Sequence, residues 1–254
     1  MAPENENETR KTTTRSLQII DAINDLNGAS LSEIAEYMNR STSTLHTHLK
    51  TLEQNEYIVK RGNTYQLGLK LFHFGENARR RDDRYQLAKQ KAFELANTTN
   101  EEINFAVEEH GRSIILFDET NSPSTEGYQV GHYFYMHNSA SGKAMLAEFS
   151  EDRTTEILDR WGLPKQTENT ITTPTKLFEE LERTQERGYA VNAQEALEGL
   201  RSVAMPVKNP DGSVFGSLDI SGPPYRLPTD EELADLLRPI IEELEDELTD
   251  YEFD

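Results

Sequence analysis

The chain has 254 residues, of which 46 are Asp or Glu and 26 are Lys or Arg, so its formal net charge is −20, and it contains no Cys. The lack of Cys excludes a disulfide framework, a thiol nucleophile and a zinc knuckle. No apolar run reaches the roughly 18 residues that a membrane span requires, and the polar start lacks a secretory signal, so we expect a cytoplasmic protein with no membrane partner.

The negative charge is distributed unevenly along the chain. Up to residue 80, ten basic residues are matched by ten acidic ones, so the whole net charge belongs to residues 81–254. The acidic residues are spread over predicted helices and loops and do not form one tail, which is typical of a solvated surface adapted to high salt. We infer a salt-loving host organism.

Three short helices are predicted after a flexible polar tail at residues 1–10. Hydrophobic periodicity indicates a first helix that stops at Gly28, and Ser30 with Glu33 has the capping-box spacing that opens a second. Ser41 caps a third helix, whose opposite sides are apolar and polar, as in a helix-turn-helix unit. The apolar side of this third helix carries Leu45, Leu49 and Leu52.

The next segment, "YIVKRGNTYQLG", predicts a hairpin that turns at residues 61–63 and carries a basic tip. A hairpin after three helices is a wing, so we predict a winged helix-turn-helix DNA-binding domain over residues 11–75. A polar helix face is usually only a solvated face, but the cap spacing, the helix order and the basic wing favour DNA contact here. The residues expected at the DNA are Ser41, Thr42, Ser43, Thr44, His46, Thr47, Lys50, Lys60 and Arg61.

A long helical stretch begins near Leu69 and contains a charge run at residues 79–83, where we place the domain boundary. We expect a linker helix over residues 76–90 and a second domain over residues 91–254. Thr229 and Glu232 cap the last helix of this domain, which Pro239 is expected to kink. The other predicted elements are hairpins that turn at residues 110–111 and 208–212, a strand within residues 128–135, and helices at about residues 141–149, 152–161 and 175–188.

The stretch "HNSASGKAMLAEF", residues 137–149, invites comparison with a phosphate-binding loop, but it lacks that loop's leading Gly and the Ser or Thr after Lys. It also lacks the leading Gly of a nucleophile elbow. His46 and His48 point in different directions on one helix, which excludes a shared metal ion. We therefore expect no catalytic residue, no metal site and no cofactor. The stretch is either a tight strand-to-helix turn with Lys143 solvated, or a helix N-terminus that approaches a bound carboxylate.

Four motifs occur in a fixed order in the second domain: Ser-Gly-Lys-Ala, Asn-Thr-Ile-Thr, Arg-Gly-Tyr-Ala and Ser-Gly-Pro. With the winged segment, they resemble the IclR family of transcription regulators over nearly the whole chain, and the acidic composition suggests a haloarchaeal member. The resemblance implies an α+β protein with a GAF-like α/β effector domain, a linker helix, and a homodimer or homotetramer. It also implies a pocket for a small-molecule effector, commonly a small acid, that involves Ala140, Ser141, Asn192, Ser202, Asp219 and Ser221.

Two residues depart from the pattern of the family. Thr47 stands where the recognition helix typically carries Arg, so one DNA contact is missing or moved. Asp219 stands where a hydroxyl is common, which adds negative charge beside a pocket expected to hold an anion. A less charged ligand, such as a sugar or a sugar lactone, is therefore a candidate.

We expect a DNA-binding transcriptional regulator that recognises a palindrome in double-stranded DNA under the control of a metabolite. The pathway is catabolic and concerns a sugar, a sugar acid or an aromatic acid, with carbohydrate favoured. An enzyme that uses the C-terminal pocket is disfavoured, because a nucleophile, metal ligands and a cofactor loop are missing. An effector-binding interaction module without DNA binding is the other alternative; the acidity favours it and the basic wing tip opposes it.

Overall fold

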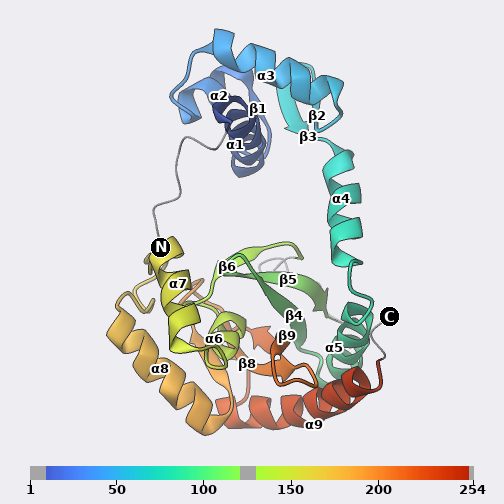
Figure 1. Ribbon diagram of the computed structural model, residues 1–254, viewed down its shortest axis with the longest axis vertical. Coiled ribbons are helices and arrows are strands. Elements are labelled where there is room, and N and C mark those ends of the chain that lie inside the picture. The colour runs from blue at the N-terminus through green and yellow to red at the C-terminus, as the bar shows by residue number, and fades with distance from the viewer. Residues whose placement is uncertain (1–9, 121–129, 252–254) are drawn as a thin grey trace. The chain divides into compact units, whose positions relative to one another are not determined.

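The computed structural model describes residues 10–120 and 130–251. The chain divides into two compact units, residues 1–81 and residues 82–254 (Figure 1). The polar tail predicted at residues 1–10 lies outside the described residues except for Arg10.

The first unit confirms the predicted helices and wing. Its elements are α1 (Lys11–Asp25), β1 (Ala29–Ser30), α2 (Leu31–Tyr37), α3 (Thr42–Gln54), β2 (Ile58–Arg61), β3 (Thr64–Leu67) and α4 (Leu69–Arg79). β2 pairs with β3 in antiparallel register, and this is the wing hairpin. The sequence did not predict β1, which pairs with β3 and gives the strand order β1-β3-β2. Two residues are too few to show a strand period.

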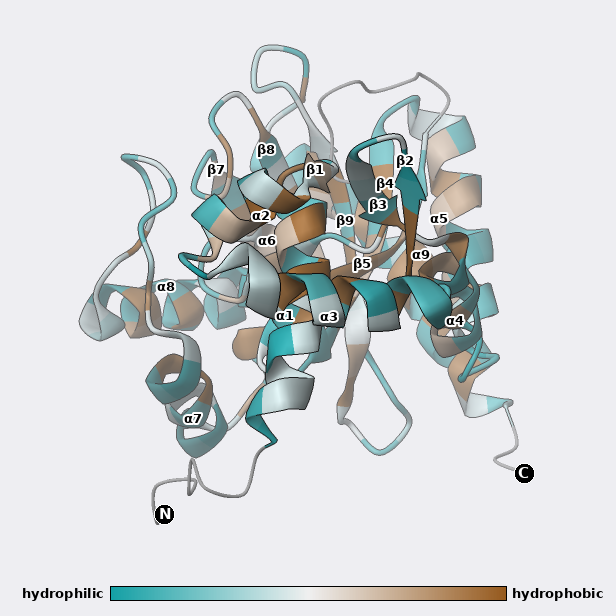
Figure 2. Ribbon diagram, turned by 90° about the horizontal axis from the view of Figure 1, so that it is seen from above, coloured by the Kyte–Doolittle hydropathy of each residue, from teal (hydrophilic) through white to brown (hydrophobic). Residues whose placement is uncertain are grey.

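The apolar side of α3 faces the core of the first unit. Leu45 and Leu49 are fully buried and belong to one cluster with Ile19, Ile23 and Ile34. Each such Leu stabilises the fold by about 2–5 kcal/mol relative to Ala. In Figure 2, hydrophobic stretches in brown alternate with hydrophilic stretches in teal along α3. The burial of the leucines leaves the polar side of the helix outside the core.

The predicted linker helix over residues 76–90 is not continuous. α4 ends at Arg79, and α5 (Tyr85–Thr99) begins after a break. In the break, Asp82 Oδ1 accepts from the backbone N–H of Arg84 at 3.0 Å and from its Nε at 2.9 Å. An Asp that bonds to a nearby backbone N–H offers the chain an alternative to the helix. The division between the two compact units falls in this break, at residues 81 and 82.

The second unit is built on an antiparallel sheet with the strand order β6-β5-β4-β9-β8-β7. The predicted hairpins are confirmed, because β4 pairs with β5 and β8 pairs with β9. β7 was not predicted, and the strand expected within residues 128–135 is limited to β6; residues 128–129 lie outside the described part. The strands are β4 (Glu102–Glu109), β5 (Arg112–Glu119), β6 (Tyr133–Tyr135), β7 (Ala190–Ala193), β8 (Arg201–Lys208) and β9 (Val214–Gly222).

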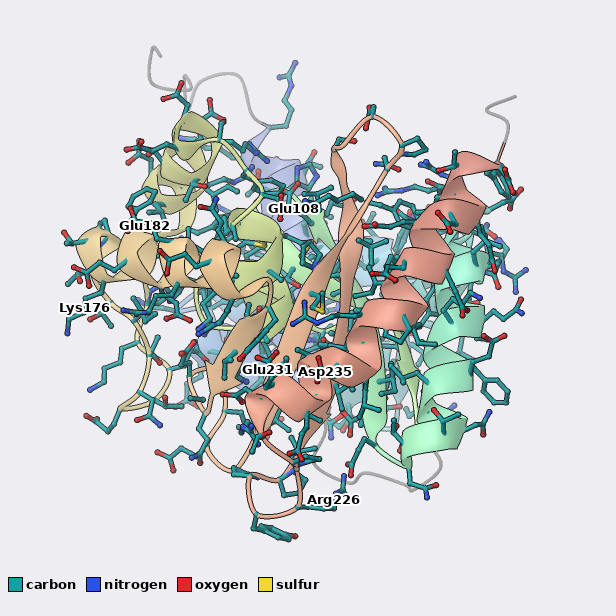
Figure 3. The ribbon with its side chains drawn as sticks, turned by 90° about the horizontal axis from the view of Figure 1, so that it is seen from below. Glu108, Lys176, Glu182, Arg226, Glu231 and Asp235 are labelled. Carbon is teal, nitrogen blue, oxygen red and sulfur yellow. The ribbon has the colours of Figure 1, made fainter. Side chains whose placement is uncertain are left out.

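Helices cover both faces of this sheet. Figure 3 shows α9 (Asp230–Thr249) crossing one face with α5 beside it. On the other side lie α6 (Ala140–Leu146), α7 (Glu151–Trp161) and α8 (Pro174–Arg187) (Figure 1). The helices predicted there are confirmed to within three residues at each end. α9 has the predicted capping box of Thr229 and Glu232, and it runs unbroken through Pro239.

Strand alternation gives the sheet two different buried faces. The side chains on one face, among them Phe105 and Leu218, join the main apolar core with α5 and α9. The other face, toward α6, carries polar groups that are nevertheless buried. Those groups are Glu102 and Asn104 on β4, Asp219 and Ser221 on β9, Ser202 on β8 and Asn192 on β7.

The acidic residues of the second unit lie largely on its outer surface. Glu231 and Asp235 on α9 and Glu182 on α8 are exposed, and Figure 3 shows them pointing away from the sheet. This agrees with the solvated acidic surface expected from the sequence. Within residues 10–120 and 130–251, no helix combines the length and the apolar character that a bilayer crossing demands.

Candidate functional site

The outer side of α3 is the first candidate site. Because the leucines face the core, this side presents hydroxyls, an imidazole and an ammonium group to solvent. A helix with such short polar side chains can enter a major groove, which admits an α-helix. The exposed predicted residues are Thr42, Ser43, His46, Thr47 and Lys50.

Two of the predicted DNA residues also form the start of this helix. Ser41 Oγ accepts from the backbone N–H of Thr44 at 3.4 Å and lies 2.9 Å from Thr44 Oγ1. Ser41 is the N-cap, a position where a hydroxyl typically contributes about 1 kcal/mol. Thr44 is half-buried, so its side chain is less accessible than those on the outer side.

The two histidines of α3 lie in different surroundings, as their spacing implied. His48 is half-buried, and its Nδ1 lies 2.8 Å from Ser16 Oγ of α1. His46 is exposed on the outer side. His48 therefore helps to hold α3 on α1, while His46 remains available to a partner.

The wing presents the two predicted basic residues, Lys60 and Arg61, in exposed positions at the end of β2. Gly62 follows with a φ of +63°, a conformation that glycine adopts without strain. Lys60 Nζ lies 5.0 Å from the centroid of the Tyr65 ring, so the ring supports the side chain.

The second candidate site is a pocket between the polar face of the sheet and the start of α6. The space between its atoms, about 180 Å³ with open solvent included, admits no water molecule, so side chains must shift before a ligand enters. Four of the predicted effector residues line it: Ala140, Ser141, Ser202 and Asp219. The rest of its described lining is Ser113, Ile115, Phe134 and Ser139.

Asp219 is the ionisable residue of this described lining. Its Oδ2 accepts from Ser141 Oγ at 2.5 Å, and its Oδ1 accepts from Asn104 Nδ2 at 3.1 Å. Burial raises the pKa of Asp219 to about 7, because loss of solvent disfavours the charged form more than these two hydrogen bonds favour it. Among the described residues, no group of three His, Asp or Glu side chains is arranged to hold a metal ion.

Asn192 and Ser221 lie near this pocket but outside its lining. Asn192 Oδ1 accepts from the backbone N–H of Glu195 at 2.8 Å, so it shapes the loop after β7. Ser221 Oγ accepts from Asn104 Nδ2 at 3.1 Å and donates to Glu102 Oε1 at 3.2 Å. Both side chains therefore support the polar face of the sheet.

Sequence reasoning missed Ser113, Ile115, Phe134 and Ser139. Alternation along β5 puts Ser113 and Ile115 on one face, which is a signal that could have found them. Phe134 joins them only through the pairing of β6 with β5, where it lies opposite Ser113. The hydroxyls of Ser113 and Ser202 are buried without a hydrogen-bond partner among the described residues. A buried hydroxyl without a partner typically costs about 1–3 kcal/mol.

Lys143 is not solvated, so the interpretation of its segment as a plain surface turn is wrong. Lys143 is fully buried, and its Nζ lies 2.8 and 2.6 Å from the two carboxylate oxygens of Glu195. The loop that carries Glu195 is held in place by Thr170 of the Asn-Thr-Ile-Thr motif, whose hydroxyl donates to the Glu195 carbonyl at 2.7 Å. The ion pair thus ties α6, a wall of the pocket, to the loop after β7.

Gly142 of the same motif permits a close approach between α6 and the chain before it. A Cβ at this position would lie 2.6 Å from the Cα of Met136. We expect Gly142→Ala to lower the free energy of unfolding by about 1–3 kcal/mol, as overpacking typically does, in urea titrations. Gly75→Ala is the matched control, because a Cβ there meets nothing within 4 Å. Equal tolerance of both substitutions would contradict the close approach.

Residues 12–62 match the IclR helix-turn-helix domain, and residues 80–246 match the domain described as bacterial transcriptional regulator IclR C-terminal. The chain is 30% identical over 239 residues to the probable HTH-type transcriptional regulator ArcR of Halobacterium salinarum, across 89% of this chain and 90% of that protein. It is 29% identical to the transcriptional repressor IclR of Escherichia coli, across 85% of this chain and 81% of that protein. The crystal structure of Thermotoga maritima IclR has a TM-score of 0.72 and 27% identity, across 93% of this chain and 98% of that chain.

These relatives are regulators and not enzymes, which confirms that expectation. The match to a haloarchaeal protein agrees with the inference from the acidic composition. The structural likeness extends over both units and confirms the predicted fold class. The chain belongs to the IclR family of DNA-binding transcriptional regulators, with an N-terminal helix-turn-helix domain and a C-terminal α/β effector domain.

Proposed function

We propose that this protein binds a palindromic operator in double-stranded DNA as a homodimer, or as a homotetramer of paired dimers, under the control of a small-molecule effector. The main observation in support of this proposal is the exposed, hydroxyl-rich outer side of α3, whose Leu45 and Leu49 are fully buried on the other side. Two copies of α3 enter successive major grooves about 34 Å apart, and the wings touch the flanking backbone or minor groove. The protein works in the cytoplasm, where it meets its operator.

The chemistry of α3 favours recognition of bases over attraction to phosphates. Up to residue 80 the basic and acidic residues balance, so the net charge of this part of the chain reduces repulsion from DNA but does not drive binding. Each phosphate contact also loses about 0.9 log units of affinity per tenfold rise in salt. In a salt-rich cytoplasm, Ser43, His46 and Thr47 therefore discriminate through direct and water-mediated hydrogen bonds to base edges.

Ser43→Ala and Thr47→Ala are each expected to weaken operator binding by about 1 kcal/mol, roughly fivefold, because each removes one hydrogen-bonding hydroxyl. The measurement is a gel shift in molar KCl with an operator identified by chromatin pull-down and sequencing. A scrambled duplex of the same composition reports non-specific binding, which both substitutions should leave unchanged.

Thr13→Ala is the matched control, because it removes an exposed hydroxyl from α1 and leaves α3 intact. Unchanged operator affinity in both α3 variants would mean that this side of the helix does not read DNA. Absence of a shared palindrome in the pull-down would instead favour an interaction module without operator binding.

The effector acts by favouring one arrangement of the paired DNA-binding domains over another. The break between α4 and α5 is the segment through which effector binding is proposed to change this arrangement. Arg84, at the start of α5, donates from Nη1 to Asn209 Oδ1 at 2.9 Å, and this supports a firm attachment of the break to the effector domain. A ligand that moves the effector domain then moves this attachment.

The regulated genes belong to a catabolic pathway for a sugar, a sugar acid or an aromatic acid, and carbohydrate is the first choice. One relative, at 29% identity, is the acetate operon repressor of Salmonella typhimurium, which supports a role in carbon metabolism. The identity of the neighbouring genes and a thermal-shift screen of small acids and sugars test this assignment.

A further inference from the structure

We propose that the pocket between the sheet and α6 takes a neutral, hydroxyl-rich small molecule and disfavours a carboxylate. The recognition groups are the carboxyl group of Asp219 and the hydroxyls of Ser113 and Ser202. This inference rests on the proposed effector role of the pocket and names the chemical class of its ligand.

The charge around the pocket opposes an anion. The described lining contains Asp219 but no Lys, Arg or His. Asn104 lies between Asp118 and Asp219 in the strand register, and Glu102 faces the same side of β4. Glu102 and Asp118 both repel the charge on Asp219. A ligand carboxylate would add a further negative charge to this row without a cation to balance it.

Lys143 does not serve as a counter-ion for the pocket. It belongs to α6, but it is absent from the lining, and its ammonium group contacts both carboxylate oxygens of Glu195 at 2.8 and 2.6 Å. Moving it toward a ligand would leave Glu195 buried without its partner, which is strongly unfavourable.

The hydrogen-bonding groups of the pocket suit ligand hydroxyls. Ser113 Oγ and Ser202 Oγ are buried without a partner, and each can both donate and accept. The Asp219 carboxylate accepts one bond at each oxygen, from Asn104 and from Ser141, and has further lone pairs for ligand O–H groups. The carboxylate group of a ligand can only accept, so it cannot donate to those lone pairs as a hydroxyl in its place would.

Part of the remaining lining is apolar. Ile115 is buried and Phe134 is half-buried beside the hydroxyls. A sugar or an alditol presents C–H groups as well as O–H groups, and the apolar side chains can cover the former. The combination of acceptors, donors and one apolar wall is typical of a site for a small molecule.

The test compares neutral sugars and alditols with the aldonates of the same carbon skeletons, on the full chain at about pH 8 in molar KCl. Calorimetry measures affinity, and a gel shift on the same samples measures operator binding. We expect a pentose, a hexose or one of their alditols to bind at least tenfold more tightly than its aldonate. Equal or tighter binding of the aldonate, or binding by none of the neutral probes, would overturn the proposed ligand class.

Substitutions test whether Asp219, Ser113 and Ser202 cause the preference for the neutral ligand over the aldonate. Asp219→Asn should raise the affinity for the aldonate at least tenfold relative to its neutral partner, while Asp159→Asn, the same charge change at an exposed position, should not. Ser113→Ala and Ser202→Ala should each lower the affinity for the neutral ligand severalfold without lowering the melting temperature, because neither hydroxyl has a partner in the part of the chain that the structure describes. An unchanged preference in Asp219→Asn would overturn the role of that carboxyl.

The two readouts separate the ligand class from the effector role. A neutral ligand that binds without changing operator affinity would overturn the effector role and uphold the ligand class. An aldonate that binds more tightly and changes operator affinity would uphold the effector role and overturn the ligand class.

Discussion

Lys143→Met is expected to lower the free energy of unfolding by about 3–5 kcal/mol, because it leaves a buried carboxylate without its partner. Glu195 is 7% exposed, and both of its carboxylate oxygens contact Lys143 Nζ. Burial raises the pKa of Glu195 even with the ammonium group beside it. Without that group the raised pKa rises further, so the loss should be smallest at low pH, where Glu195 is protonated in both states, and largest at high pH.

Urea unfolding in molar KCl, followed by the fluorescence of Trp161 in the second unit, measures this loss. Lys176→Met is the matched control, because Lys176 is exposed on α8. The double variant Lys143→Met with Glu195→Leu removes both charges and should recover much of the stability. A loss below about 1 kcal/mol in the single variant near neutral pH would contradict the structural role of the ion pair.

Asp219→Asn is expected to stabilise the protein at high pH by a few kcal/mol. The pKa of Asp219 is about 7 in the folded chain and 3.8 for an ordinary Asp carboxyl, so between these values the folded state holds a proton that the unfolded state releases. The free energy of unfolding then falls as pH rises through this window, by at most about 1.4 kcal/mol per pH unit. The side-chain amide of the Asp219→Asn variant does not titrate, so the variant does not lose stability in this way as pH rises.

The measurement is the free energy of unfolding of wild type and Asp219→Asn from pH 4 to pH 8. The difference in favour of the variant should grow with pH and level off above about pH 7. Asp118, whose pKa burial also raises to about 7, titrates in both proteins, and its repulsion of the Asp219 charge adds to the difference. Asp159→Asn, at an exposed position, is the control. Parallel curves for wild type and Asp219→Asn would show that Asp219 is ionised throughout.

Many features of the fold could be predicted because short segments specify them. The caps at Ser41 and Thr229 depend on a hydroxyl and a backbone N–H three residues later. The hairpin of β4 and β5 depends on His110 and Gly111, which adopt φ of +56° and +80°. The outer side of α3 was also predictable, because the period of its leucines fixes which residues remain exposed.

Other features could not be predicted because they depend on residues distant in the sequence. β1 and β7 are too short to show a period, and they are strands because β3 and β8 lie beside them. In the break between α4 and α5, the side chain of Asp82 accepts from the backbone N–H of Arg84, which competes with the helix inside a stretch of helical character.

By itself the sequence determined most of the helices and strands, the wing and the exposed polar side of α3, since periodicity, caps and turns act within a few residues. The tertiary structure decided the burial of Lys143, because its partner lies 52 residues away on a loop that other residues hold in place. It also decided the pocket, which assembles side chains from β5, α6, β8 and β9. Desolvation and pairing of charges depend on what surrounds a group in space, and the local pattern of residues does not specify that.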